Sequence, residues 1–253
     1  MVRPGIVEFA SDMTTSSPPV RALSAAGLVL GLLCLAAMPA ARAQTSAQTD
    51  EGFYVGVGFG SSTFDQSKAD FDAGVLGSFT DAGLTVSSPT SKLDDSSNEA
   101  HALVGYRFNS YYGFELAFVD VGKLSYSATM TLSGGGLPSP SPSSISGEVS
   151  SKGPILSVLG SVPLHKRWEV FGRAGLFYAD TTIAVGATVA GVASSSSVSA
   201  HSTDWALGVG GAFNASRRFS IRLEYQKLKN VGDPDRTGEG DVDVIDLGLL
   251  IRL

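Results

Sequence analysis

The sequence has little cysteine, few histidines and, after its first 43 residues, no long apolar run. Its one cysteine is Cys34, so we exclude disulfides and thiol chemistry for the chain beyond residue 43. No later stretch approaches the ~20 apolar residues that a membrane helix needs. The three histidines, at positions 101, 165 and 201, lack metal-ligand spacing. If the processed chain lies in a membrane, it must cross as a closed barrel.

Positive charge is also scarce. The chain has 18 Lys and Arg residues against 24 Asp and Glu residues, which gives a net charge of −6. The first 43 residues hold three of the bases and two of the acids, so the remaining chain has a net charge near −7. Nucleic-acid binding needs a basic surface, and we therefore expect no nucleic-acid partner.

The first 43 residues have the three parts of a secretory signal peptide. Arg21 precedes an apolar run over 22–40, and the small-x-small site Ala41-Arg42-Ala43 follows it. We expect residues 1–43 to be removed and residues 44–253, about 210 residues, to form one domain. A retained transmembrane helix is the alternative.

Eight later segments alternate apolar and polar residues with period two, which is typical of strands with different environments on their two faces. Runs of roughly 7 to 11 residues suit tilted strands that cross a bilayer. The facing of the fourth segment is ambiguous. The segments lie at 53–59, 100–108, 114–121, 154–162, 168–178, 205–213, 219–225 and 245–253.

The connections between these segments alternate strictly between short and long. Membrane barrels have short periplasmic turns and longer outer loops. We therefore predict an all-β fold, an eight-stranded antiparallel up-and-down transmembrane β-barrel with short periplasmic turns and long extracellular loops. The short turns lie at 109–113, 163–167 and 214–218, and the long connections at 61–98, 123–152, 179–202 and 229–242.

The long connections are rich in Ser, Gly and Pro, as over 133–145 and 194–199. Such segments bury too little apolar surface to order themselves alone, so we expect mobile loops. The first long connection differs, because Phe71, Val75 and Phe79 are spaced like one face of a short helix. We expect this helix to fold over the barrel mouth.

Charged residues of the strands share one face, opposite the apolar face. Lys or Arg facing lipid near the bilayer midplane costs roughly 2–4 kcal/mol, so we place the charges inside and expect a polar interior. An eight-stranded interior is only wide enough for side chains to fill, and a network of mixed sign would plug it. The predicted lumen ionic network is Arg107, Glu115, Arg173, Arg222, Glu224 and Asp246.

The first short turn sets the expected register of its hairpin. If Phe108 pairs with Phe114, then Arg107 lies opposite Glu115 as a cross-strand ion pair.

Glycines share the inward face with the charges. The third short turn is expected to place Gly208 opposite Glu224, which makes room for the carboxylate. The run Gly56-Val57-Gly58-Phe59-Gly60 lacks the helix that follows a nucleotide-binding loop. We expect no cofactor and no metal.

Four short motifs resemble those of the OmpA-like eight-stranded outer-membrane barrel family, over about residues 52–253. They are Gly105-Tyr106-Arg107-Phe108-Asn109, Gly113-Phe114-Glu115, Arg173-Ala174-Gly175 and Arg222-Leu223-Glu224-Tyr225-Gln226. The resemblance implies an outer-membrane location and a lumen network of paired acidic and basic side chains. Glu115, Arg173, Arg222 and Glu224 hold matching positions.

The chain departs from the family pattern at two lumen positions. The lysine expected in the fourth strand is replaced within Ser157-Val158-Leu159, and the glutamate expected in the sixth strand is Gly210. The resemblance implies three partners: outer-membrane lipids, lipopolysaccharide, and the barrel-assembly machinery, which would read the last strand during biogenesis. The peptidoglycan-binding domain of full-length relatives is not expected.

We expect a structural or surface-interaction protein of a Gram-negative envelope, without enzymatic activity, whose outer loops meet a ligand that the sequence does not name. Three alternatives stay open. They are a narrow, low-conductance pore, a lipid-A-modifying enzyme that uses His201 and Asp204 at the outer rim, and a soluble periplasmic ligand-binding barrel.

Overall fold

The computed structural model describes residues 51–253, and the signal peptide expected over 1–43 lies outside the described residues. Every expected strand is present, and several are far longer than expected. No helix within 51–253 is long and apolar enough to cross a membrane. The elements are β1 (Gly52–Phe64), α3 (Lys68–Asp81), β2 (Leu84–Asp94), β3 (Ser96–Arg107), β4 (Tyr112–Gly134), β5 (Ser141–His165), β6 (Trp168–Val189), β7 (Val192–Asn214), β8 (Phe219–Val231) and β9 (Gly240–Arg252).

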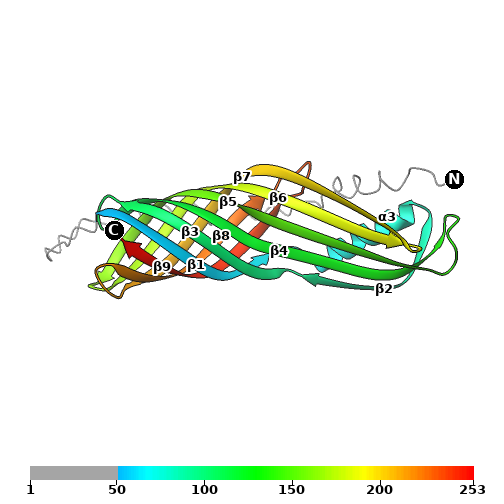
Figure 1. Ribbon diagram of the computed structural model, residues 1–253, viewed down its shortest axis with the longest axis horizontal. Coiled ribbons are helices and arrows are strands. Elements are labelled where there is room, and N and C mark those ends of the chain that lie inside the picture. The colour runs from blue at the N-terminus through cyan, green and yellow to red at the C-terminus, as the bar shows by residue number, and fades with distance from the viewer. Residues whose placement is uncertain (1–50) are drawn as a thin grey trace, which may run out of the picture.

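Eight of the strands form a closed antiparallel ring in the order β1-β3-β4-β5-β6-β7-β8-β9 (Figure 1). The ring closes where β1 pairs with β9, from Tyr54 opposite Arg252 to Phe64 opposite Val242. Closure leaves no unpaired edge within the ring, as a membrane requires of strands. The predicted eight-stranded antiparallel barrel is confirmed.

Strand β2 continues the path of β3 along the same edge of β4. Within β4, β3 pairs with Gly113 to Asp120 and β2 pairs with Ser125 to Gly134. Gly122 lies at the break with a φ of 75°, and a Cβ atom there would overlap the Ser97 side chain. Glycine is therefore required where the wall changes from β3 to β2.

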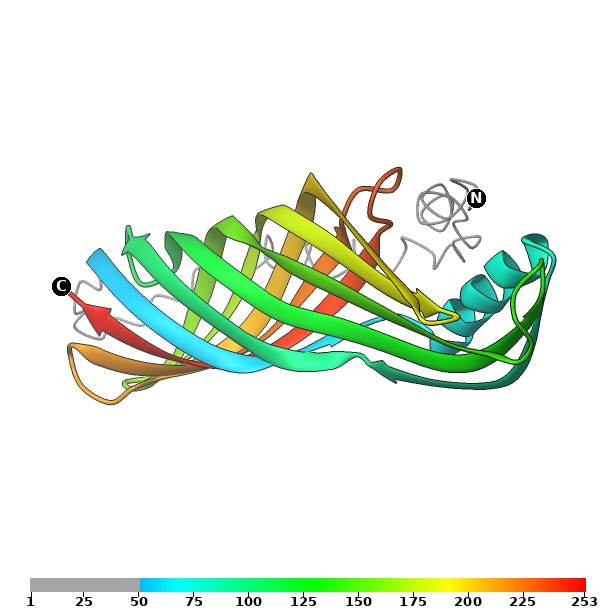
Figure 2. The same cartoon turned by 45° about the vertical axis from the view of Figure 1, so that its right-hand side comes forward.

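The strands β4, β5, β6 and β7 continue well beyond the ring and form, with β2, a five-stranded sheet that projects from the outer end (Figures 1 and 2). We call this the outer extension. The expectation of mobile loops over 123–152 and 179–202 is wrong, because these segments are β-hairpins. Each Ser-rich strand receives its hydrogen-bond ladder from a neighbour that the barrel already holds in register.

The tip of the β6–β7 hairpin is a two-residue turn. Ala190 and Gly191 have φ angles of 53° and 82°. Positive φ at both central residues gives the twist that matches paired antiparallel strands. This turn keeps β6 and β7 paired to Val189 opposite Val192.

Alternation separates a lipid-facing surface from the lumen. Phe53, Phe59 and Leu223 are 57%, 70% and 57% exposed on the outer surface, while their strand neighbours point inward. The facing of the fourth segment is now resolved, because Leu156 and Val158 point outward and Ser157 inward. A continuous exposed apolar band is what lipid covers in a membrane barrel.

The register of the first short turn differs from the prediction by two residues. Tyr106, and not Phe108, pairs with Phe114, so Gly105 lies opposite Glu115. The side chain of Asn109 accepts hydrogen bonds from the backbone N–H groups of Tyr111 and Tyr112 and closes the turn early. A shift of two residues keeps every side chain on its expected face.

The register of the third short turn also differs from the prediction by two residues, but in the opposite direction, because Phe213 pairs with Ile221 and not with Phe219. Gly208 pairs with Gln226 and not with Glu224. The Ser216 hydroxyl accepts hydrogen bonds from the backbone N–H groups of Arg218 and Phe219, at 3.2 and 3.1 Å, and tightens this turn.

The helix expected in the first long connection is confirmed as α3. It lies against the inner face of the outer extension, at the end farthest from the short turns (Figure 2). Val75 and Phe79 are buried against a cluster that includes Tyr126, Met130 and Leu132. The apolar inner surface of the lumen continues along the outer extension, and the helix covers it there.

Candidate functional site: the barrel lumen

Glu115 of β4 is the centre of an ionic cluster that crosses the lumen. Its Oε1 atom accepts hydrogen bonds from the Tyr54 hydroxyl at 2.7 Å and from Arg222 Nη1 at 2.5 Å. Its Oε2 atom accepts from Arg173 Nη1 at 2.9 Å. One carboxylate thus joins side chains of β1, β6 and β8.

Glu224 completes the cluster from the same strand as Arg222. Its Oε1 atom lies 2.7 Å from Nε of Arg173, and its Oε2 atom lies 3.5 Å from Nε of Arg222. The Arg173 Nη2 group also donates to Gln226 at 3.2 Å. Two carboxylates and two guanidinium groups therefore balance in charge.

The cluster is almost completely removed from solvent. Glu115 and Glu224 are each 1% exposed, Arg222 is 2% and Arg173 is 5%. The Arg222 guanidinium also lies over the Phe171 ring, 5.1 Å from its centre. Buried charges are tolerated only with close partners and hydrogen bonds, so each of the four side chains depends on the others.

Arg107 and Glu169 form a separate ion pair nearer the short turns. The two side chains meet in a bidentate arrangement, with Arg107 Nη1 donating to Glu169 Oε2 at 2.9 Å. The expected pair of Arg107 with Glu115 is therefore wrong. Glu169 has inward parity but was not among the expected network residues, and only the closed barrel brings β6 within reach of β3.

Asp246 pairs with Glu224 across β8 and β9, and its side chain lies beside Glu99 and His101. His101 Nδ1 is 2.7 Å from Glu99 Oε1, and His101 Nε2 is 4.0 Å from Asp246 Oδ1. All three side chains are buried. This group lies farther from the short turns than Glu115, because His101 and Asp246 are level with Gly58 and Gly60 of β1.

The outer part of the lumen is apolar, which corrects the expectation of a polar interior throughout. Six side chains there are at most 2% exposed and fill the space between the ionic cluster and the outer extension. They are Val119, Val121, Leu124, Phe177, Leu228 and Val242. The sequence pattern concealed this layer because apolar residues on the inward face break the expected alternation of polarity.

The two departures from the family pattern lie inside the barrel. Ser157 is buried opposite Glu115. A Cβ atom at Gly210 would overlap the Phe171 ring, 2.8 Å from Cε1. The aromatic ring thus fills the space beside a position where the resemblance implies a carboxylate.

A family model described as the OmpA-like transmembrane domain matches residues 48–253. The chain belongs to the OmpA-like outer-membrane barrel family. No curated protein matches its sequence.

Solved structures similar to the OmpA-like barrel are distant in sequence. Ail of Yersinia pestis is 16% identical, with 80% of this chain and 99% of Ail covered and a TM-score of 0.37. The N-terminal β-barrel domain of OprF of Pseudomonas aeruginosa is 9% identical, with 79% and 98% covered and a TM-score of 0.38. The outer membrane protease OmpT of Escherichia coli is 10% identical, with 83% and 99% covered and a TM-score of 0.44. The family model, and not these likenesses, decides the family.

His201 and Asp204, the two residues expected of a lipid-A-modifying enzyme, lie on opposite faces of β7 in the OmpA-like barrel. His201 is exposed, with Nδ1 at 3.6 Å from Asp180. Asp204 is buried and accepts a hydrogen bond from Ser202 at 2.6 Å. An acid and a histidine on opposite faces cannot act on one substrate atom. Within residues 51–253, no group of His, Asp and Glu is arranged to hold a metal ion.

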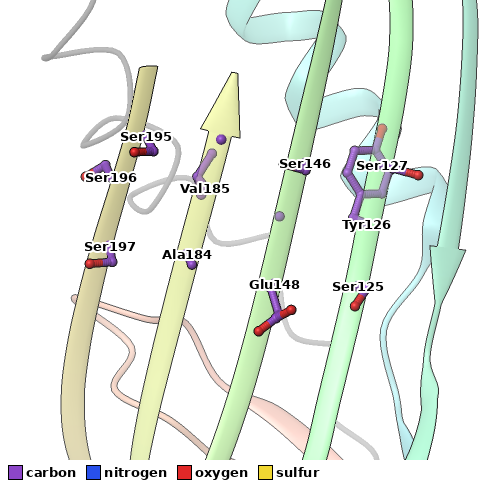
Figure 3. Close-up of a pocket in the computed structure, with 12 residues that line it drawn as sticks. Ser125, Tyr126, Ser127, Ser146, Glu148, Ala184, Val185, Ser195, Ser196 and Ser197 are labelled. Carbon is purple, nitrogen blue, oxygen red and sulfur yellow. The ribbon is translucent and has the colours of Figure 1, made fainter. Parts of the chain in front are cut away.

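The outer extension of the OmpA-like barrel carries a groove of about 650 Å³ across β4, β5, β6 and β7 (Figure 3). Serine side chains from three of these strands line it, and Glu148 is its one charged residue. Glu148 is paired with Lys123 at 2.7 Å. The groove therefore presents hydroxyl groups and little charge.

Contacts of α3 beside this groove set the ionisation of two side chains. Asp72 receives hydrogen bonds from Lys68 at 2.6 Å and from Tyr126 at 2.8 Å. The hydrogen bond from Lys68, with smaller contributions from Ser91 and Tyr126, lowers the pKa of Asp72 to about 2. Burial, and then the contact with Asp72, raises the pKa of Tyr126 to about 12.

Proposed function

We propose that the OmpA-like barrel is a closed structural and surface-interaction protein of the outer membrane, and not a pore. The observation that carries this proposal is the bridge that Glu115 makes between Arg173 and Arg222 across the lumen. The interior of an eight-stranded barrel is only wide enough for side chains to fill, so a hydrogen-bonded bridge across it obstructs the path that an ion would take.

A second barrier supports the plug. The apolar layer of Phe177, Leu228 and their neighbours lies between the ionic cluster and the outside. Hydrophobic constrictions exclude water and so oppose ion passage. An ion would therefore have to cross both an ionic and an apolar barrier.

The interaction role rests on the outer extension. Its strands hold the hydroxyl-lined groove beyond the ring, where a partner outside the cell can reach it (Figure 3). We infer that its ligand is polar and largely uncharged, because Glu148 is the one charged residue there and is already paired. Ail has been crystallised with the heparin analogue sucrose octasulfate, but this groove lacks the basic residues that a sulfated ligand needs.

Planar-bilayer recording tests the closed lumen. The wild-type protein is expected to give no conductance steps. A variant that opens only the ionic cluster, Glu115→Ser with Arg222→Ser, should also stay closed, because the apolar layer remains. Adding Phe177→Ser and Leu228→Ser should produce steps.

Heat-modifiable mobility on gels serves as the folding control for each variant. Steady conductance of the folded wild-type protein would refute the plug and favour the narrow-pore alternative. Conductance in the Glu115→Ser, Arg222→Ser variant would show that the apolar layer is no barrier.

The Ser-rich groove is tested by binding of neutral glycans to the protein in nanodiscs. The wild-type protein is expected to bind neutral glycans, and replacing Ser146 and Ser195 by Glu should abolish this binding. A bound glycan would displace the water that solvates the two new carboxylates, and burial of an unpaired charge is costly. Binding only to sulfated glycans would contradict the inferred ligand class.

A further inference from the structure

Basic residues gather at the end of the barrel opposite the outer extension. Lys166 and Arg167 lie in the turn between β5 and β6, and Arg217 and Arg218 lie in the turn between β7 and β8. Neither turn contains an acidic residue. This placement contrasts with the net negative charge of the chain.

The two turns are neighbours in space. The backbone N–H of Asn214 donates to the carbonyl oxygen of Arg167 at 2.7 Å, and Trp168 pairs with Phe213 across β6 and β7. The four basic side chains are all exposed. Among residues 51–253, none of the four takes part in an ion pair. We call these four residues the basic rim.

Aromatic side chains place the basic rim at the height of the lipid headgroups. Trp168 follows Arg167 directly, is 55% exposed and packs its ring 4.7 Å from the Phe213 ring. Phe219 follows Arg218 directly and is 46% exposed. Exposed aromatic residues of a membrane barrel mark its interfaces with water, so the adjacent guanidinium groups reach phosphates.

We propose that the basic rim is a binding site for anionic glycerophospholipids of the inner, periplasmic leaflet. The short turns face the periplasm, so the lipids within reach are those of that leaflet. Arginine binds phosphate through two parallel N–H groups. The acyl chains of the same lipid would pack on Trp168 and Phe219. This site lies at the other end of the molecule from the groove, so lipid binding at the basic rim does not depend on the proposed function.

The position of the two tryptophans allows a direct test. Trp168 is at the basic rim and Trp205 is at the outer end of the lipid-facing surface, 61% exposed. The variants Trp205→Phe and Trp168→Phe each retain one reporter. Each variant is placed in phosphatidylcholine vesicles that contain a small fraction of brominated phosphatidylglycerol, and quenching of its tryptophan fluorescence is measured. The same measurement with brominated phosphatidylcholine normalises the result.

The ratio of quenching by the anionic lipid to quenching by the neutral lipid reports enrichment around each tryptophan. Each basic residue near a membrane surface enriches anionic lipid by about fivefold at low salt. We expect a ratio several-fold above one at Trp168 and near one at Trp205. The excess at Trp168 should fall as salt is raised.

Two double variants, matched in the number of charges removed, assign the effect. Arg217→Gln with Arg218→Gln should bring the ratio at Trp168 close to one. Lys92→Gln on the outer extension, with Lys152→Gln near the outer end of the ring, should leave it unchanged. Both pairs lie on exposed positions, and gel mobility checks that each variant folds. Equal ratios at the two tryptophans overturn the proposal. That result is expected if the basic rim binds the cell wall or a soluble periplasmic partner. An excess that survives Arg217→Gln with Arg218→Gln also overturns the proposal.

Discussion

Glu115 and Arg222 are 107 positions apart in the sequence, yet Oε1 of Glu115 lies 2.5 Å from Nη1 of Arg222 in the lumen. Both side chains are at most 2% exposed. Each has the other as a partner of opposite charge, so the loss of one leaves a buried charge that is only partly compensated. The stability of the barrel therefore depends on this pair.

Replacing Arg222 with Met should lower the free energy of unfolding by roughly 3–5 kcal/mol, because Glu115 and Glu224 then share a single arginine in a buried site. Urea unfolding in lipid vesicles measures this. The exposed Lys152→Met change is the control and should stay within about 0.5 kcal/mol. Breaking a buried ion pair costs ~3–5 kcal/mol, so a loss of less than ~1 kcal/mol for Arg222→Met would mean that water solvates the lumen carboxylates.

Glycine at position 208 leaves room for the ionic cluster. A Cβ atom there would overlap Glu224 Oε1 and lie 3.1 Å from Arg173 Cγ. Gly208→Ala should therefore destabilise the barrel by about 1–3 kcal/mol through overpacking. Gly172→Ala on the neighbouring strand is the matched control, since its Cβ atom would come no closer than 3.8 Å to any atom. Equal unfolding midpoints for the two variants would contradict this account.

Phe79 anchors α3 to the outer extension and is 5% exposed. Phe79→Ala should weaken docking of the helix by about 3–5 kcal/mol, while the ring of strands is unaffected. Hydrogen exchange resolves the two, because the amides of α3 should lose protection and those of β8 and β9 should keep it. Thr80→Ala, on the exposed side of the same helix, is the control. Uniform loss of protection in the barrel would show that the helix also stabilises the ring.

Docking of α3 should depend on pH through Asp72. Its pKa in the folded protein, about 2, lies below the ordinary 3.8. A carboxyl group with a lowered pKa adds stability that is complete above about pH 4 and is lost as the pH falls through about 2. A titration of the Asp72 carboxyl carbon by NMR measures the shift.

The Lys68→Met variant identifies the cause of that shift. Removing the ammonium group, which makes the largest contribution, should return the pKa of Asp72 toward 3.8. Tyr126→Phe should raise it by less. A pKa of Asp72 that does not change in Lys68→Met would contradict the assigned contact.

The alternation of residues along each strand determined which side chains face lipid and which face the lumen. Arg107, Glu115, Arg173, Arg222, Glu224 and Asp246 are all buried inside the ring, on the face that their parity indicates. Facing can be predicted because it depends on a period of two within one short segment. The helix α3 was also predictable from a single segment, because Phe71, Val75 and Phe79 are spaced four residues apart, as on one face of a helix.

Only the tertiary structure decided which partner each of these side chains has. Arg107 meets Glu169 and not Glu115, because the capped turn at Asn109 shifts the hairpin by two residues and barrel closure brings β6 near. The outer extension could not be predicted from the sequence either, because Ser-rich segments with little apolar surface become strands only beside a partner strand that is already in place. Register, closure and templated pairing join residues tens of positions apart, and no pattern within a single segment records them.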